Sequence, residues 1–176
     1  MIAFFLYFAV YTVPMVKNKI IELRFSEYDS QDELSKEDQL LLNEAMKASK
    51  HAYAPYSHFS VGAALKIDTG EIITGNNREN ASFPSGICAE HTAIAYAGSK
   101  YPGSVITTVA ICARKGNDYT DIPVSPCGKC RQVLSEEEDR SGIKIKIILY
   151  GKSGIYVING IENLLPLRFS SSVIRP

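Results

Sequence analysis

The sequence predicts an α/β fold of three layers, in which helices cover both faces of a mixed five-stranded sheet. Helical and strand-like segments alternate along most of the chain, and this alternation is typical of a sheet that is covered on both faces. The last two strand-like segments, 143–150 and 155–159, are separated only by Gly-Lys-Ser-Gly. So short a connection permits an antiparallel pair, whereas a parallel pair needs a crossover of a dozen or more residues. The sheet is therefore predicted to be mixed, with an antiparallel last pair.

The first predicted helix runs from Ser35 to about residue 51. The Ser35 hydroxyl can accept the free backbone N–H of Asp38, which is typical of a helix N-cap. Apolar and small residues then recur at helical spacing, at Leu41, Leu42, Ala45, Met46 and Ala48. Ahead of this helix, residues 16–25 are predicted to form a short edge strand and 27–36 a polar linker.

The remaining elements follow from short apolar runs and from turn residues. Asp68-Thr69-Gly70 is a hairpin signal between two strands. A β-branched apolar run at 105–113 predicts a buried central strand. In chain order we predict strands at 59–67 and 71–75, a loop at 76–86, a helix at 87–97 that ends at Gly98, the strand at 105–113, a loop at 114–126 and a helix at 127–139.

Composition limits the classes of function. The chain has 176 residues, 45% of them hydrophobic and 22% charged, which is typical of one globular domain and excludes disordered, coiled-coil and collagen-like chains. Nineteen basic residues balance nineteen acidic ones. Because a neutral chain lacks the electrostatic attraction that dominates affinity for phosphate backbones, we expect no nucleic-acid partner.

The amino terminus differs from the rest of the chain. Residues 2–13 form an apolar run that is shorter than the roughly 20 residues of a membrane span. It has no positive charge ahead of it and no signal-peptidase site after it. We hypothesise that translation begins at Met15, so that residues 1–14 are absent from the natural protein; a weak membrane anchor is the alternative. The predicted organisation is an extension at 1–34 and one domain at 35–176, without stable membrane contact.

Cysteines carry the strongest chemical signal. Four cysteines are too few for a disulfide scaffold in a chain of this length, and the pair Cys127-x-x-Cys130 indicates metal or redox chemistry in a reducing, cytoplasmic compartment. Cys88, Cys127 and Cys130 can hold Zn²⁺ as thiolates and leave the fourth tetrahedral position to water. Both segments lie at predicted helix starts, where free N–H groups stabilise thiolates. The alternatives are a structural zinc site or buried thiols.

Glu90 lies two residues from one candidate ligand. It cannot easily join a closed site, but it can face the metal-bound water and transfer protons. Three ligands, an open position and an adjacent carboxylate describe a catalytic zinc site. Cys112, which lies on the apolar strand, is predicted to be a small buried hydrophobe.

These motifs resemble the zinc-dependent nucleobase deaminases, whose signature is H-x-E or its cysteine variant followed by P-C-x-x-C. More closely, the chain resembles the small-subunit, homotetrameric cytidine deaminases. The similarity runs from about Leu40 to Phe169 and is carried by four stretches, Tyr53-Ala54-Pro55-Tyr56-Ser57-x-Phe59-Ser60-Val61-Gly62-Ala63-Ala64-Leu65, Gly75-Asn76-Asn77-Arg78-Glu79-Asn80-Ala81-Ser82, Cys130-Arg131-Gln132 and Leu164-Leu165-Pro166-x-x-Phe169.

The resemblance implies one zinc per chain, a cytoplasmic homotetramer with shared active sites, and hydrolytic deamination of cytidine and 2′-deoxycytidine in pyrimidine salvage. It implies that Asn77 and Glu79 hold the ribose hydroxyls, that Phe59 packs on the nucleoside and that backbone N–H groups at Ala89 orient the pyrimidine carbonyl. Phe169 matches an aromatic that reaches a neighbouring subunit's site. From their residue types alone, Asn77 could be a turn residue, Phe59 a core residue and Phe169 an ordinary apolar residue.

The chain departs from the family at two positions. His91 stands where the family usually has an arginine that hydrogen-bonds the zinc thiolates. Three thiolates and one Zn²⁺ sum to −1, which arginine offsets and histidine offsets only partly; the alternative is a satisfied helix histidine without an electronic role. Gln132 is grouped with His91 as a residue that supports the ligands. Phe83 replaces a usual tyrosine, so that one interface hydroxyl is missing.

Other functions compete with the preferred one. A blasticidin-type or other nucleoside-analogue deaminase shares the zinc motif and the fold. A nucleic-acid deaminase is disfavoured by the zero net charge and by the predicted antiparallel last pair, because those enzymes typically end on a parallel strand. A non-catalytic zinc protein is disfavoured by the intact Glu90.

Overall fold

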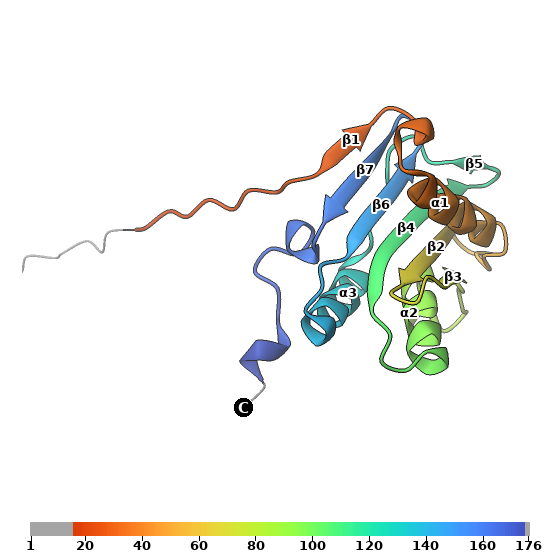
Figure 1. The fold of residues 1–176 in the computed structure, drawn as a ribbon. Helices are drawn as coiled ribbons and strands as arrows, with labels where there is room; N and C mark the ends of the chain where they lie inside the picture. Colours follow the sequence, from red (N-terminus) through yellow and green to blue (C-terminus); the bar gives the residue numbers. More distant parts are fainter. Residues whose placement is uncertain (1–15, 175–176) are drawn as a thin grey trace, which may run out of the picture.

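A mixed sheet forms the centre of the computed structural model, which describes residues 16–174 (Figure 1). The strand order is β1-β7-β6-β4-β2-β3, and β5 pairs with β4. The strands are β1 (Ser26–Tyr28), β2 (Phe59–Ile67), β3 (Ile72–Asn76), β4 (Ile106–Lys115), β5 (Asp118–Tyr119), β6 (Lys146–Gly151) and β7 (Gly154–Asn159). The helices are α1 (Lys36–Ser49), α2 (Ala89–Lys100) and α3 (Gly128–Ser141).

Strand directions confirm the predicted mixed sheet. β4 pairs with β6 in parallel, whereas β2 pairs antiparallel with both β3 and β4. The last pair, β6 and β7, is antiparallel with Tyr150 opposite Ile155. The four-residue separation therefore predicted the direction of β7 correctly.

The predicted number of five strands is wrong, because the sheet has seven within residues 16–174. The added strands are β1, which lies in the predicted linker and pairs with β7, and β5, which lies in the predicted loop 114–126. Strands of three and two residues are too short to carry an alternating apolar pattern. The predicted edge strand at 16–25 is not formed, since β1 begins only at Ser26.

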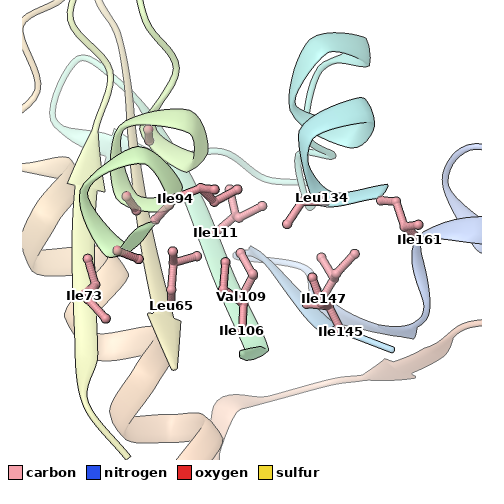
Figure 2. Close-up of a cluster of buried hydrophobic side chains, with 14 of the residues drawn as sticks. Leu65, Ile73, Ile94, Ile106, Val109, Ile111, Leu134, Ile145, Ile147 and Ile161 are labelled. Carbon is pink, nitrogen blue, oxygen red and sulfur yellow. The ribbon is translucent and has the colours of Figure 1, made fainter. Parts of the chain in front are cut away.

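Three layers are present, as predicted. α1 packs on one face of the sheet, where Leu41, Leu42 and Ala45 join side chains such as Ala110 and Ile148. α2 and α3 cover the other face (Figure 1). Their side chains enclose a larger cluster with the sheet, as Figure 2 shows for Leu65, Ile73, Ile94, Ile106, Val109, Ile111, Leu134, Ile145, Ile147 and Ile161.

Local capping explains the start of α1 and the end of α3. Ser35 caps α1, because its Oγ accepts the N–H of Asp38 at 3.2 Å. α3 ends at Gly142, which adopts the left-handed conformation that favours glycine (φ 72°). The prediction that the second helix ends at Gly98 is wrong: α2 continues to Lys100, since glycine in a helix lowers stability without breaking the helix.

A close contact between helix and sheet sets the start of α2. A Cβ on Gly75 in β3 would lie 2.4 Å from the carbonyl oxygen of Ala89 and 2.7 Å from the backbone nitrogen of Ala93. Only glycine therefore lets the first turn of α2 lie this close to β3. The position of Cys88, immediately before that turn, depends on this contact.

The ends of the chain bear on three predictions. The hypothesis about residues 1–14 lies outside the described residues. In residues 16–174, no helix is both long enough and apolar enough to cross a membrane. The boundary before Ser35 stays a prediction, although β1 joins the sheet and Leu34 is buried in the core.

Candidate metal centre and active site

Three cysteine sulfurs converge where α2 and α3 begin. Cys88 is the N-cap of α2, Cys127 is the N-cap of α3, and Cys130 lies in the first turn of α3. Their Sγ atoms all lie within 4.8 Å of one another, and those of Cys88 and Cys127 are 3.7 Å apart. The topology therefore joins two sequence motifs into one cluster.

The cluster fits zinc. Two thiolates at about 2.3 Å from one tetrahedral zinc lie about 3.8 Å apart, close to the distance between Cys88 and Cys127. The pKa of Cys88 is lowered to about 6, mainly by the hydrogen bond from the Cys130 thiol and to a smaller extent by Cys127, Lys129 and His91. Within residues 16–174 the cluster contains these three cysteines and no fourth protein ligand. Three thiolates with one open position are typical of a catalytic site.

Glu90 lies beside the cluster on the first turn of α2 and is only 4% exposed. Burial raises its pKa above the ordinary value of a glutamate. A carboxyl group with a raised pKa can accept and return a proton near neutral pH. Glu90 lines the same cavity as Cys88 and Cys127.

That cavity, of about 270 Å³, is the candidate substrate site. One side is the cluster with Ala89 and Glu90. The other side consists of residues from β2 and β4, from the loops before β2 and after β3, and from the loop before α3. The lining includes Ser57, Phe59, Val61, Asn77, Glu79, Ile111, Val124 and Ser125. A second cavity, of about 460 Å³, continues from it past Asn77, Glu79 and Cys88 toward Tyr56 and Phe83.

Glu79 is half-buried, and the loop before β2 orients its carboxylate. Its Oε2 accepts the backbone N–H groups of Tyr56 and Ser57 at 2.9 and 3.2 Å, and its Oε1 accepts the Ser57 hydroxyl. The Ser57 hydrogen bond is the main reason why the pKa of Glu79 is lowered. Glu79 is therefore an ionised acceptor in a fixed place, which suits a sugar hydroxyl.

Asn77 lines both cavities and also supports β2. Its Nδ2 donates to the Phe59 carbonyl at 2.9 Å, and its Oδ1 accepts the Val61 N–H at 2.7 Å. An amide has two donors and two acceptor sites, so that one of each remains for a ligand. The structural and the binding interpretations of Asn77 are therefore compatible.

Phe59 and Ala89 both line the candidate substrate site. Phe59 is half-buried at the first position of β2. Ala89 begins α2, where the first backbone N–H groups have no partner within the helix. The structure thus brings the residues predicted for the nucleoside into contact with the same cavity as the cysteines.

His91 and Gln132 have different surroundings. The Nδ1 atom of His91 is buried and has no hydrogen-bond partner within the described part of the chain; its predicted role beside the ligands stays a prediction. The Gln132 side chain donates to the carbonyl oxygen of Phe169 at 2.9 Å. Gln132 therefore holds the carboxy-terminal segment, and its predicted support of the ligands stays untested.

Phe169 and Phe83 are exposed aromatic residues. Phe169 is 60% exposed and does not line the cavity beside the cysteines. Phe83 is 76% exposed and packs edge-on against Tyr56, with ring centroids 6.0 Å apart. The hydrophobic core of the chain therefore does not bury either ring.

Cys112 is buried on β4 at 1% exposure, as predicted. Burial raises the pKa of its thiol to about 11.

Three residues that line the cavity were not predicted from the sequence: Ser57, Val124 and Ser125. Ser57 contacts Glu79 across 22 residues, so that no local pattern connects the two.

Known proteins are similar to this chain in sequence. Residues 35–144 match the family model of the cytidine and deoxycytidylate deaminase zinc-binding region. A cytidine deaminase of Sporosarcina psychrophila is 38% identical over 130 residues, which cover 74% of this chain and 89% of that protein. A cytidine deaminase of Halalkalibacterium halodurans is 44% identical over 98 residues, which cover 56% and 70%.

Solved structures agree with the sequence relatives. A crystal structure of cytidine deaminase from Burkholderia pseudomallei superposes with a TM-score of 0.63 at 36% identity, over 74% of this chain and 97% of that one. A crystal structure of cytidine deaminase from Mycobacterium tuberculosis superposes with a TM-score of 0.59 at 32% identity, over 74% and 95%. With a family match across more than half of the sequence and three cysteines converging on one open site, the chain belongs to the zinc-dependent cytidine deaminases.

Proposed function

We propose that this protein hydrolyses the exocyclic amine of cytidine, and of 2′-deoxycytidine, to give uridine or 2′-deoxyuridine and ammonia. One observation carries the proposal: the buried Glu90, together with Cys88 and Cys127 of the three-cysteine cluster, lines the same cavity as an oriented, ionised Glu79. A metal site would activate water at one end, and a carboxylate would accept a sugar hydroxyl at the other. A free nucleoside spans such a site, and a role in pyrimidine salvage in the cytoplasm follows from that substrate.

Bound zinc would supply a water molecule whose pKa is lowered to ~7. Cys88, Cys127 and Cys130 hold the metal, and the helix N-termini stabilise their thiolates. Glu90 takes a proton from the attacking water and gives it to ring nitrogen N3. The oxygen of that water bonds to C4 of the base.

Glu90 also serves the second half of the reaction. It delivers the remaining proton of the water to the amine, the C4–N4 bond breaks, and ammonia leaves. The N–H groups at Ala89 orient the pyrimidine carbonyl, while Asn77 and Glu79 hold the ribose. Because Glu90 is buried beside the metal ligands, the proton transfers are shielded from bulk water.

The test is a substrate panel with purified, zinc-loaded protein and with a matched zinc-loaded Glu90→Gln variant. Cytidine and 2′-deoxycytidine should lose their absorbance and release one ammonia per product, and the variant should not turn over. Free cytosine should be a much poorer substrate, because it lacks the sugar that binds at Glu79.

Three results would contradict the assignment. Equal kcat/KM for cytosine and cytidine would remove the nucleoside specificity. Turnover of blasticidin S but not of cytidine would favour a nucleoside-analogue deaminase, and turnover only of cytosine within a single-stranded oligonucleotide would favour a nucleic-acid enzyme. The antiparallel β7 and the zero net charge argue against the last outcome.

The protein assembles as a homotetramer in which Phe169 closes a neighbour's site. The exposed rings of Tyr56, Phe83 and Phe169 support this proposal, because large apolar side chains are stabilised by burial against a partner. Light scattering should give four times the 19.4 kDa chain mass. Removing the residues after Leu164 should reduce activity more than zinc content. A fully active monomer would contradict the shared site.

A further inference from the structure

One face of α3 binds the carboxy-terminal segment, defined here as residues 164–174. Gln132, Ser135 and Asp139 follow one another at spacings of three and four residues, which places them on one stripe of the helix. Gln132 donates to the carbonyl oxygen of Phe169, as described above. Arg168 donates to Ser135 Oγ at 3.1 Å and to Asp139 Oδ1 at 2.7 Å.

Asp139 binds the chain on both sides of Phe169. On the amino-terminal side it pairs with Arg168. On the carboxy-terminal side its Oδ2 accepts the Ser170 hydroxyl at 2.7 Å and the Ser171 backbone N–H at 3.2 Å. The Asp139 side chain is only 12% exposed, and the Ser170 hydrogen bond is the main reason why its pKa is lowered. One ionised carboxylate therefore holds three residues around one phenylalanine.

The Phe169 ring has no comparable support. Its backbone carbonyl and both of its neighbours are held on α3, whereas the residue itself is 60% exposed. Leu167, two residues earlier, is 92% exposed and has a φ of 56°, a conformation unfavourable for residues other than glycine. Hydrogen bonds thus hold this backbone in a strained path that directs an apolar ring away from its own core.

We propose that Asp139 is a positioning residue that fixes the backbone on both sides of Phe169, so that the ring is presented in one direction to the active site of a second copy of the chain. This inference rests on the proposed shared site. Asp139 would touch no substrate. It would order the carboxy-terminal segment before assembly, so that less conformational entropy is lost when the segment binds the second copy. A segment that is ordered before assembly closes the site at a lower entropic cost than a mobile one.

The kinetic test uses Asp139→Asn, Phe169→Ala and the double variant, with zinc content and assembly state measured for each. Glu137→Gln is the matched control, because it neutralises a carboxylate on the same helix that pairs with Arg140 and not with the carboxy-terminal segment. Asp139→Asn should raise KM for cytidine roughly tenfold with a smaller change in kcat, since misplacement of a positioning group by ~1 Å can cost up to 10²-fold. The control should match the parent.

The double variant decides whether Asp139 acts through Phe169. If it does, Asp139→Asn should have no further effect on KM once Phe169 is alanine, because effects on one coupled unit are non-additive. Asp139→Glu, which keeps the charge, should recover part of the loss. An equal loss in both backgrounds, or an unchanged KM in Asp139→Asn, would overturn the inference.

A spectroscopic test separates this inference from the proposed activity. The chain contains ten tyrosines but no tryptophan, so that Phe169→Trp introduces a single indole, which can be excited selectively at wavelengths that tyrosine does not absorb. Its emission in the assembled protein should be blue-shifted, as for a buried indole, and should shift toward the solvent-exposed value when Asp139→Asn is added. A solvent-exposed emission in the assembled Phe169→Trp protein would overturn the inference whatever the substrate proves to be, whereas a blue shift in a protein that does not deaminate cytidine would reject only the proposed function.

Discussion

The two sides of the candidate substrate site are built by different means. The metal side consists of two helix starts, and Cys130 and Glu90 are buried there. The sugar side consists of two loops, where Glu79 is half-buried and is oriented by hydrogen bonds from Ser57 and Tyr56. Burial fixes Glu90 and Cys130 on the metal side, whereas hydrogen bonds orient Glu79 on the sugar side. We therefore expect the metal side to determine stability and kcat, and the sugar side to determine KM.

The largest effect should come from Cys130→Ala, because it removes a buried metal ligand. Zinc content and activity should both collapse, and Tm should fall, since metal-binding energy contributes to folding. Cys112→Ala is the matched control: it removes a buried thiol from β4 and should keep one zinc per chain. Metal analysis and thermal unfolding check both variants. Full zinc occupancy in Cys130→Ala would mean that the metal side is built from other ligands.

Glu90→Gln should come next, because it removes proton transfer and preserves the shape. General acid–base catalysis is worth roughly 10²–10⁴-fold, so that kcat should fall by at least this factor with zinc retained. Steady-state kinetics at measured zinc occupancy test the prediction. Activity within a few-fold of the parent would exclude Glu90 as the proton carrier.

A smaller effect is expected at His91, which lies beside the ligands with its Nδ1 unpartnered in the described residues. His91→Ala should reduce kcat by ~10–100-fold at fixed zinc occupancy, as changes next to metal ligands typically do. His91→Arg should be tolerated, since arginine can offset the negative charge of the thiolates. If the alanine variant is as fast as the parent, His91 has no electronic role.

The smallest effects should come from the sugar side. Glu79→Gln should raise KM for cytidine by about 5-fold, because it replaces a charge-assisted hydrogen bond by a neutral one that is weaker by about 1 kcal/mol, and Ser57→Ala should raise it less. Both variants should leave the slow turnover of free cytosine unchanged, which is an internal control. KM should also rise as the pH falls toward the lowered pKa of Glu79, because a protonated carboxyl group is a weaker acceptor. In Ser57→Ala this rise should begin at higher pH, because the hydrogen bond that lowers the pKa of Glu79 is lost. A matching loss with cytosine would show that Glu79 does not act through the sugar.

The comparison also shows what a sequence pattern can predict. Cys88, Glu90, Cys127 and Cys130 were found because each pair lies within one helical turn, where spacing alone determines which residues are neighbours. The antiparallel β7 was found because a four-residue connection allows little else. Both constraints act between residues that are close in the chain, so both can be recognised from the sequence alone.

Contacts between distant segments were not predicted in this way. The hydrogen bonds between Ser57 and Glu79 span 22 residues, and those between Asp139 and Ser170 span 31. β1 and β5 formed at residues expected to be irregular, because β7 and β4 offered them unpaired edges. None of these contacts leaves a period or a motif in the sequence.

By itself, the sequence determined the three-layer class, the order of the long elements and the chemical identity of the metal side, because these depend on residue types and on spacings within a few residues. Only the tertiary structure decided that Cys88, Cys127 and Glu79 line one cavity and that α3 holds both sides of Phe169. The physical reason is that such contacts arise when the buried faces of α2, α3 and the sheet pack together. That packing is a property of the whole hydrophobic core and not of any one segment.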